Sequence, residues 1–317
     1  MFRTDYRELI LSGGGTKGLL MLGALAHLQS RGCLDHVHRY VGASVGSIVA
    51  LLLAVGYGAH DVFNVLLNVE FKRLFRLDVD NLFRLKGDRS YGLCDNRPLA
   101  AVLGEMLAHK GLSPTITFQA LRVHTGKSLN LVAYNLSHMK HHAFSHRTSP
   151  DVSVVRACLA SASIPVVFPP MTFPSHTKND LYIDGGVLES LPQRFAKYRT
   201  RSLRVYIVTR EINLPLQIKT FMDYLSSVVL CIAARVNNAA TLLNHCEKGS
   251  RRASRRRGKN NEPRSRLLKL SSRDARASWL DLSMSREAKH QLFEDGVACA
   301  ENNGRTTNGS RAGAEVG

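Results

Sequence analysis

The sequence predicts an α/β protein with three layers, α/β/α, around a mostly parallel central sheet. Within the first 60 residues, apolar runs and helix-like segments alternate in the order strand, loop, helix, strand, turn, helix. Parallel strands need a crossover between them, usually a helix, so this alternation indicates a parallel sheet covered by helices. The loop and the turn are both rich in glycine, as expected where a chain turns sharply from a strand into a helix.

The N-terminal part divides into short elements with clear boundaries. Apolar runs predict the strands, apolar faces with helical spacing predict the helices, and glycines mark the helix ends. In chain order we expect a strand at Leu9–Leu11, a helix at Leu19–Leu28 ending near Arg31–Gly32, a strand at Val37–Val41, a tight turn at Gly42–Gly46 and a helix at Ser47–Val55 capped by Gly56.

The rest of the chain continues the alternation less regularly. Residues 61–110 have an amphipathic helical pattern that is interrupted at Gly87–Asn96, and the polar stretch His138–Ser149 is expected to be a loop. Further strands are expected at Leu129–Tyr134, Leu181–Ile183 and Leu203–Thr209, further helices at Val152–Ala162, Phe221–Leu243 and Ser285–Asp295, and an extended piece at Phe168–Pro170.

Charge is distributed unevenly along the 317 residues. The net charge is +18, and residues 248–276 hold twelve Lys/Arg against Glu262 and Asp274. This balance favours an anionic partner, either nucleic acid or an acidic membrane surface. The six cysteines show no C-x-x-C spacing, which argues against a disulfide framework and against a cysteine-rich zinc site.

We expect an intracellular protein that is soluble or attached peripherally to a membrane. Charged residues between Arg3 and Glu8 interrupt the N-terminus, so no signal peptide is evident. The longest uncharged stretch, Tyr40–Ala59, is broken by glycines and serines and is a poor candidate for a transmembrane helix.

The loop Gly13-Gly14-Gly15-Thr16-Lys17-Gly18 follows the first strand and admits three interpretations. A P-loop would need Lys-Ser/Thr after the last glycine, where the chain has Leu19-Leu20. A dinucleotide loop fits the G-x-G-x-x-G spacing, but Asp35 precedes the second strand, whereas a ribose-binding acid belongs at its end. An oxyanion hole, in which backbone N–H groups at a helix N-terminus stabilise a negative intermediate, needs a nucleophile nearby.

The turn Gly42-Ala43-Ser44-Val45-Gly46 supplies a candidate nucleophile, because it matches G-x-S-x-G. In that motif the serine occupies a strained turn from strand to helix, and the neighbouring glycines leave the space that the turn requires. The alternative is a turn of small residues packed against a helix.

A serine nucleophile needs a base, and two candidates remain open. Histidines are crowded in one polar stretch: His138, His141, His142 and His146. That stretch is expected to be a solvated loop. Asp184 ends an apolar strand before two glycines and could be held rigidly against a facing loop, although Asp-Gly is also a common turn.

Taken in order, the glycine loop 13–18, the turn 42–46 and Asp184-Gly185-Gly186 resemble the motifs of the patatin-like phospholipase family. Ala160–Pro170 looks like the segment that precedes the family's acidic motif. Ser283–Gly296, with Lys289, Leu292 and Phe293, looks like its closing helix. The resemblance covers about residues 8–210 and implies a patatin-like variant of the α/β-hydrolase theme.

The resemblance implies a Ser-Asp dyad without histidine. Ser44 would attack the carbonyl carbon of a lipid ester, Asp184 would take its proton and return it to the leaving alcohol, and water would hydrolyse the acyl-enzyme. Burial could raise the pKa of Asp184 and make it a better base. The oxyanion hole would be formed by Gly13, Gly14, Gly15, Thr16, Lys17 and Gly18, and the motifs would be supported by Gly42, Gly46, Gly185 and Gly186.

The chain departs from the family pattern at two places. The family usually has arginine where Lys17 stands, so the planar guanidinium is lost while the charge is kept. The family often has asparagine where Glu189-Ser190 stands, which leaves the surroundings of Asp184 open.

The expected domain organisation places most of the chain in one unit. We expect a patatin-like catalytic domain at 8–210, a helical extension at 211–247, a basic and disordered segment at 248–277, a C-terminal helix returning to the core at 278–300 and a disordered tail at 301–317.

The expected function is a lipid acyl hydrolase of the phospholipase A type that acts on phospholipid or another acyl lipid. No cofactor and no metal, calcium included, is expected. The run Arg251–Lys259 suits an anionic membrane surface. It suits nucleic acid less well, because no aromatic residues are interleaved. The alternatives are an acyltransferase, an esterase of neutral lipid or lysophospholipid, and a non-catalytic protein that binds membrane or nucleic acid through the basic segment.

Overall fold

The strands form one mixed sheet. A computed structural model describes residues 2–75, 91–174, 180–198, 200–208, 265–272 and 280–305, together with residues 228 and 231. In this part of the chain the sheet has eight strands. They are β1 (Glu8–Leu11), β2 (Arg39–Ala43), β3 (Ser128–Asn135), β4 (Lys140–Ser145), β5 (Met171–Phe173), β6 (Asp180–Asp184), β7 (Ser202–Ile207) and β8 (Arg266–Leu270).

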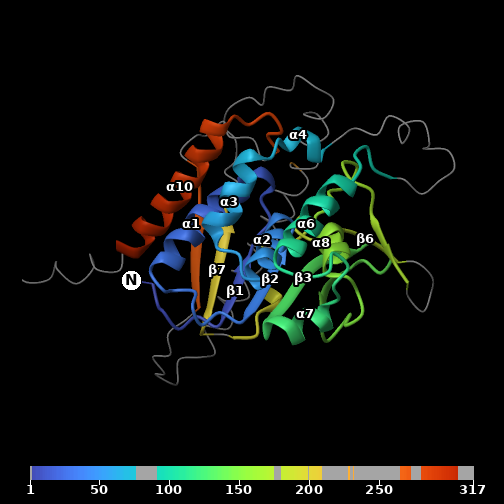
Figure 1. Ribbon diagram of the computed structural model, residues 1–317, viewed down its shortest axis with the longest axis horizontal. Helices are drawn as coiled ribbons and strands as arrows, with labels where there is room; N and C mark the ends of the chain where they lie inside the picture. Colours follow the sequence, from blue (N-terminus) through green and yellow to red (C-terminus); the bar gives the residue numbers. More distant parts are fainter. Residues whose placement is uncertain are drawn as a thin grey trace, which may run out of the picture.

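Helices alternate with the strands along the chain (Figure 1). The α-helices are α1 (Gly18–Ser30), α2 (Val45–Ala54), α3 (Ala59–Asn68), α4 (Phe71–Leu74), α6 (Arg97–His109), α7 (Phe118–Thr125), α8 (Val154–Ser161) and α10 (Arg286–Arg305). Two short 3-10 helices are η1 (Gly15–Lys17) and η3 (Gln193–Phe195). No helix of the described part is both long and apolar enough to cross a membrane.

The centre of the sheet is parallel and one end is antiparallel. The strand order is β5-β6-β3-β2-β1-β7-β8, with β4 paired to β3 outside this path. The neighbouring strands β3, β2, β1, β7 and β8 pair in parallel. Strands β6 and β4 run antiparallel to β3, and β5 runs antiparallel to β6. This topology confirms the mostly parallel sheet that the alternation predicts.

The sheet is covered on both sides because its buried side chains alternate. In β1, Leu9 and Leu11 join the large core cluster with α1, α2 and α3, whereas Ile10 points to the other face and packs in a smaller cluster near η3, with Leu191 and Phe195. Helical segments on both faces of a mixed sheet confirm the predicted three-layer α/β class.

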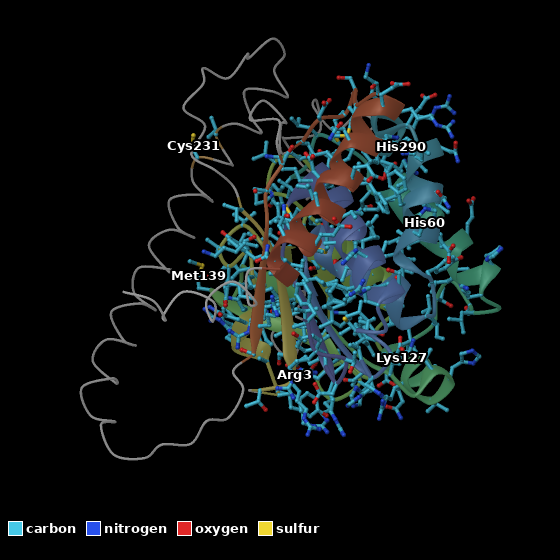
Figure 2. All side chains as sticks on the ribbon, turned by 90° about the vertical axis from the view of Figure 1, so that its left-hand side faces the viewer. Arg3, His60, Lys127, Met139, Cys231 and His290 are labelled. Atoms are coloured by element: carbon cyan, nitrogen blue, oxygen red, sulfur yellow. The ribbon has the colours of Figure 1, made fainter. Side chains whose placement is uncertain are left out.

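Helix α10 returns from the C-terminal part of the chain and packs along α1 (Figure 1). Figure 2 looks onto α10, with His290 on it and His60 on the neighbouring α3. Glycines allow the two helix backbones to touch: a Cβ on Gly23 would lie 1.9 Å from the Phe293 carbonyl oxygen, and a Cβ on Gly296 would lie 2.0 Å from that of Leu20. The predicted C-terminal helix is therefore part of the main core.

Three expectations about secondary structure were wrong. His138–Ser149 is not a loop, because its residues 140–145 form the strand β4, which pairs only with β3 and so tolerates polar side chains on an edge. The segment 248–277 is not all disordered, since Arg266–Leu270 forms β8. The expected tail from residue 301 begins too early, because α10 continues to Arg305.

Other expectations lie outside the described residues. The helix Phe221–Leu243, the extension 211–247, the basic run Arg251–Lys259 and the end of the tail belong to segments that the structure leaves undescribed, apart from residues 228 and 231.

Candidate active site

Ser44 stands at a sharp turn between β2 and α2. Its φ of 56° and ψ of −130° place a non-glycine residue in a rarely adopted conformation. The flanking glycines make this turn sterically possible. A Cβ on Gly42 would lie 2.2 Å from the Gly46 carbonyl oxygen, and a Cβ on Gly46 would lie 2.6 Å from that of Leu11. The predicted tight turn is thus present, with the helix starting at Val45 rather than at Ser47.

Two further serines hold the Ser44 backbone in this conformation. The Ser44 N–H donates to Ser161 Oγ at 3.1 Å, and the Ser161 hydroxyl donates to the Val132 carbonyl at 2.6 Å. The Ser47 hydroxyl donates to the Ser44 carbonyl at 2.6 Å. Sequence reasoning did not identify Ser161 or Ser47 as site residues. Ser161 belongs to the Ala160–Pro170 segment noted there, but nothing in that segment indicates a bond to a turn far away in the sequence.

Strand β3 brings Asp184 next to Ser44. Along one edge β3 pairs first with β2, where Ala43 lies opposite Val132, and then with β6, where Asp184 lies opposite Ala133. The other edge is occupied by β4. Because β2 and β6 meet on the same edge at consecutive β3 residues, the residue after Ala43 faces the end of β6. The Ser44 hydroxyl consequently donates to Asp184 Oδ2 at 2.6 Å.

The Asp184 carboxyl group is buried and held by backbone N–H groups. Ser44 is 4% and Asp184 1% exposed. The Gly186 N–H donates to Asp184 Oδ1 at 2.6 Å, and the Val187 backbone also contributes. Burial raises the pKa of Asp184 to about 6, against the smaller lowering effect of these hydrogen bonds and of Ser44. The carboxyl group is a stronger base than an ordinary aspartate.

The glycine loop passes directly over Ser44. A Cβ on Gly13 would lie 3.1 Å from Ser44 Cβ, so a side chain there would crowd the nucleophile position. Two donors of the loop are used internally: the Gly13 N–H donates to the Ser190 carbonyl at 2.9 Å, and the Lys17 N–H to the Gly14 carbonyl at 3.2 Å. Among the described residues, no protein acceptor is found for the N–H groups of Gly14 and Gly15.

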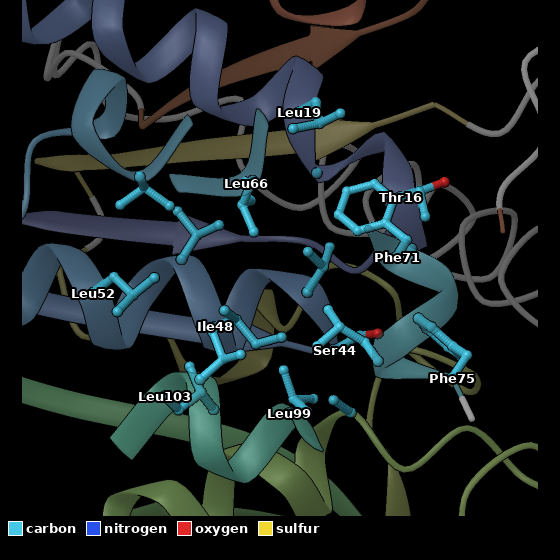
Figure 3. A pocket seen from close by; sticks show the side chains of 18 of the residues that line it. Thr16, Leu19, Ser44, Ile48, Leu52, Leu66, Phe71, Phe75, Leu99 and Leu103 are labelled. Atoms are coloured by element: carbon cyan, nitrogen blue, oxygen red, sulfur yellow. The ribbon is translucent and has the colours of Figure 1, made fainter. Parts of the chain in front are cut away.

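A cavity of about 130 Å³ opens beside Ser44 (Figure 3). Its volume is comparable to that of apolar cavities that hold a benzene-sized molecule. Of the lining residues that the structure describes, only Ser44 and Thr16 carry a polar side chain. The others come from the glycine loop, from α1, α2, α3, α4 and α6, and from the segment 162–168, together with Phe75 and Leu280. The cavity can therefore hold an apolar group beside the Ser44 hydroxyl.

Three of the four clustered histidines contact residues other than Ser44. On β4 and the turn before it, His138 lies 3.2 Å from Asp180, His142 lies 3.2 Å from the Ser149 hydroxyl, and His141 packs edge-on against Tyr134. Burial, with the Arg194 charge, lowers the pKa of His141 to about 4. Of the two base candidates that the sequence left open, the structure places Asp184 beside Ser44.

Glu189 and Ser190, where the chain departs from the family pattern, do different things. The Ser190 carbonyl accepts the Gly13 N–H bond and so ties the residues after Gly186 to the glycine loop. The Glu189 carboxylate is paired with Arg194, and burial raises its pKa. The hydrogen bonds given to the Asp184 carboxyl group come from Ser44, Gly186 and Val187.

Comparison with known proteins finds relatives that act on lipids. The chain is 32% identical over 197 residues to "Probable lipid hydrolase 463L" of Invertebrate iridescent virus 6, which covers 62% of this chain and 65% of the viral protein. It is 27% identical over 217 residues to a cGAMP-activated phospholipase of Pseudomonas aeruginosa, covering 62% and 57%. With triacylglycerol lipase 4 of Saccharomyces cerevisiae the identity is 29% over 211 residues, covering 58% and 22%. The chain thus spans less than two thirds of each of these relatives.

The fold also has a counterpart among solved structures. The type III effector protein ExoU superposes with a TM-score of 0.51 at 18% identity, over 95% of this chain and 53% of ExoU. At this identity the likeness concerns the fold alone. The model of the family described as patatin-like phospholipase matches residues 9–197, which is more than half of the chain and includes the glycine loop, the Ser44 turn and Asp184-Gly185-Gly186. The chain belongs to the patatin-like phospholipase family.

Proposed function

We propose that this protein is a lipid acyl hydrolase of the phospholipase A type, in which Ser44 is the nucleophile and Asp184 is the general base. The observation that carries this proposal is the buried 2.6 Å hydrogen bond from the Ser44 hydroxyl to the Asp184 carboxylate, beside an apolar cavity. A hydroxyl needs a base within hydrogen-bond distance to become a nucleophile, and Asp184 is the side chain in that position.

The proposed reaction proceeds through an acyl-enzyme. Ser44 Oγ attacks the ester carbonyl carbon while its proton passes to Asp184 Oδ2. The tetrahedral intermediate collapses, the alkoxide leaves, and Asp184 returns the proton to it as the alcohol. A water molecule then attacks the acyl-enzyme, with Asp184 accepting its proton and Ser44 regaining one. A pKa of about 6 suits both roles, because the carboxyl group is ionised at neutral pH but close enough to that pH to accept a proton.

The oxyanion of the intermediate would be held by the glycine loop. Within the described part of the chain the N–H groups of Gly14 and Gly15 have no protein acceptor, and the loop leads into the N-terminus of α1. A helix N-terminus carries a partial positive charge, which favours a negative oxygen. The other predicted members, Gly13, Thr16, Lys17 and Gly18, would shape the loop.

The substrate class follows from the cavity and from the relatives. An apolar wall next to the nucleophile fits a fatty-acyl chain. The names of the relatives include a lipid hydrolase, a phospholipase and a triacylglycerol lipase. An acyltransferase, or an esterase of neutral lipid or lysophospholipid, would use the same dyad. Product analysis distinguishes these: free fatty acid indicates hydrolysis, and an acylated alcohol acceptor indicates transfer.

A fluorophosphonate probe tests the proposed nucleophile. Wild type should be labelled, Ser44→Ala should not be labelled, and Asp184→Asn should be labelled at least a hundredfold more slowly, the usual range of a lost general base. Ser30→Ala, an exposed serine at the end of α1, is the matched control and should behave as wild type. Labelling that persists in Ser44→Ala, or full hydrolytic rate in Asp184→Asn, would exclude the dyad.

The proposed action on lipid includes attachment to a membrane surface. Val166 belongs to the segment 162–168, which contributes to the cavity lining, and it is 44% exposed; the isolated bridge between Gly92 and Val166 brings Tyr91, which is 57% exposed, close to this segment. Lys72 and Arg73 are exposed on α4, whose other residues face the cavity. Tyrosine and basic residues are typical of contacts with an anionic membrane.

Vesicle flotation tests this attachment. Anionic vesicles should carry the protein and zwitterionic ones should carry less. If competing RNA abolished the binding of the protein to anionic vesicles, the nucleic-acid alternative would be favoured instead.

A further inference from the structure

The cavity beside Ser44 is long rather than round, because its lining follows one face of α2. Ser44, Ile48 and Leu52 are spaced four residues apart and lie in a row in Figure 3. Residues with this spacing stand one above the other on a helix. The cavity therefore starts at the Ser44 hydroxyl and follows α2 toward its C-terminal end.

Helix α6 runs beside this row. On α6 the lining residues are Leu99, Val102, Leu103 and Met106, again with helical spacing. Figure 3 places Leu99 near Ser44 and Leu103 near Ile48. The row on α6 thus begins at the nucleophile, and Met106 lies at its far end.

A hydrogen bond places Met106 at the closed end of the cavity. The Tyr57 hydroxyl donates to the Met106 carbonyl at 2.9 Å, and Tyr57 follows directly after the last turn of α2. Tyr57 and Ala59 are buried in the main core, so the space beyond Met106 is filled. Leu52, from the last turn of α2, and Met106 form the end wall.

The length of the cavity can be estimated from helix geometry. Eight residues separate Ser44 from Leu52, which corresponds to about 12 Å at the rise of an α-helix. Carbon–carbon bonds of about 1.5 Å with near-tetrahedral angles advance an extended alkyl chain by about 1.25 Å per carbon. An extended chain of about ten carbons therefore spans the distance between the nucleophile and the end wall.

We infer that this cavity measures the acyl chain, with Met106 and Leu52 as the residues that set its limit near ten carbons. This inference rests on the proposed function for the direction of the chain, whose carbonyl lies at Ser44 and whose methyl end lies at Met106. Each methylene that enters removes apolar surface from water, and a methylene beyond the end wall does not.

Binding of free fatty acids tests the inference without requiring catalysis. We would measure dissociation constants of saturated fatty acids of graded length for the wild-type protein by calorimetry, below their critical micelle concentrations. Affinity should rise about fourfold per added carbon, the value for a fully buried methylene. The rise should stop near ten carbons. Continued rise to fourteen carbons would overturn the inference.

Substitutions at the end wall should move this limit in opposite directions. Met106→Ala, which removes most of the side chain, should move it upward by about two or three carbons. Met106→Phe should move it downward. Leu107→Ala is the matched control, since Leu107 is the next residue of α6, is fully buried and does not line the cavity. Thermal melting verifies that each variant is folded, and the two Met106 variants supply independent tests if one is not.

The outcomes separate this inference from the proposed function. A limit that is the same in wild type, Met106→Ala and Met106→Phe would show that the end wall does not measure the chain, whatever the chemistry at Ser44. A protein that shows the shifts in binding but no fluorophosphonate labelling would retain the inference about the cavity and lose the proposed hydrolase.

Discussion

Ionisation of the buried Asp184 carboxyl group should make the native protein less stable above pH 6, and Asp184→Asn should remove this loss of stability. Asparagine is neutral at every pH, whereas the buried carboxyl group must ionise as the pH rises. Its pKa is raised by burial from 3.8 to about 6, a difference of roughly 3 kcal/mol at about 1.4 kcal/mol per unit. A raised acid pKa stabilises the native state below 3.8, and this contribution is lost as the pH rises through about 6.

Between pH 4.5 and pH 8 the raised pKa of Asp184 should lower the free energy of unfolding of wild type by about 2 kcal/mol. Urea unfolding of wild type and Asp184→Asn at both pH values measures it. The free energy of unfolding of the variant, relative to that of wild type, should be about 2 kcal/mol larger at pH 8 than at pH 4.5, so that the variant gains stability over wild type toward high pH. Because the comparison is between two pH values, the steric effect of the amide cancels.

The exposed Asp151, which lies just before α8, serves as the control for a change of formal charge. Asp151→Asn should change the unfolding free energy equally at both pH values. If Asp184→Asn behaved in the same way, or gained stability toward low pH, burial would not be the dominant influence on the Asp184 carboxyl group.

Three further predictions concern the site and its supports. Hydrolysis, measured as kcat/KM, should fall about tenfold per pH unit below pH 6, because Asp184 then holds a proton and cannot accept another; a flat profile from pH 5 to pH 8 would exclude it as the base. Gly185→Ala should destabilise by about 1–3 kcal/mol in calorimetry, because its Cβ would lie 2.2 Å from the Val132 carbonyl oxygen, and unchanged melting would contradict this geometry. Lys289→Met should cost about 1.5–3 kcal/mol in urea unfolding, because the buried ammonium group donates to carbonyls at the end of α3; the exposed Lys269→Met should cost much less.

The sequence predicts the motif-bearing half of the fold well because local chemistry decides it. A strained turn needs glycines on both sides of the serine, so Gly42 and Gly46 predict the turn from the sequence alone. Parallel strands in the middle of a sheet are mostly apolar, and the apolar residues of β1 and β7 are sufficient to predict both strands. The pairing of Ser44 with Asp184 is not local. It depends on β2 and β6 sharing one edge of β3, which no pattern within either strand records.

The two missed strands, β4 and β8, are rich in polar residues, and such segments are mistaken for loops when they are judged by composition. In β8, Leu268 and Leu270 are buried between exposed Leu267 and Lys269. Ser161 was missed because its role is to bridge two backbones, and a serine in a helix of small residues has no distinguishing pattern.

The close crossing of α1 and α10 determines when the site can be assembled during synthesis. Helix α1 begins at the glycine loop, and the backbone of α10 packs against it at Gly23. The family match ends at residue 197, well before that helix. A fragment ending at residue 210 would contain the glycine loop, the Ser44 turn and Asp184-Gly185-Gly186 yet expose the apolar side of α1 that packs on α10. We therefore expect the nascent chain to be inactive on the ribosome, and the fragment to show neither a cooperative melting transition nor labelling at Ser44. Hydrolytic activity would then appear only once the chain has been made through α10.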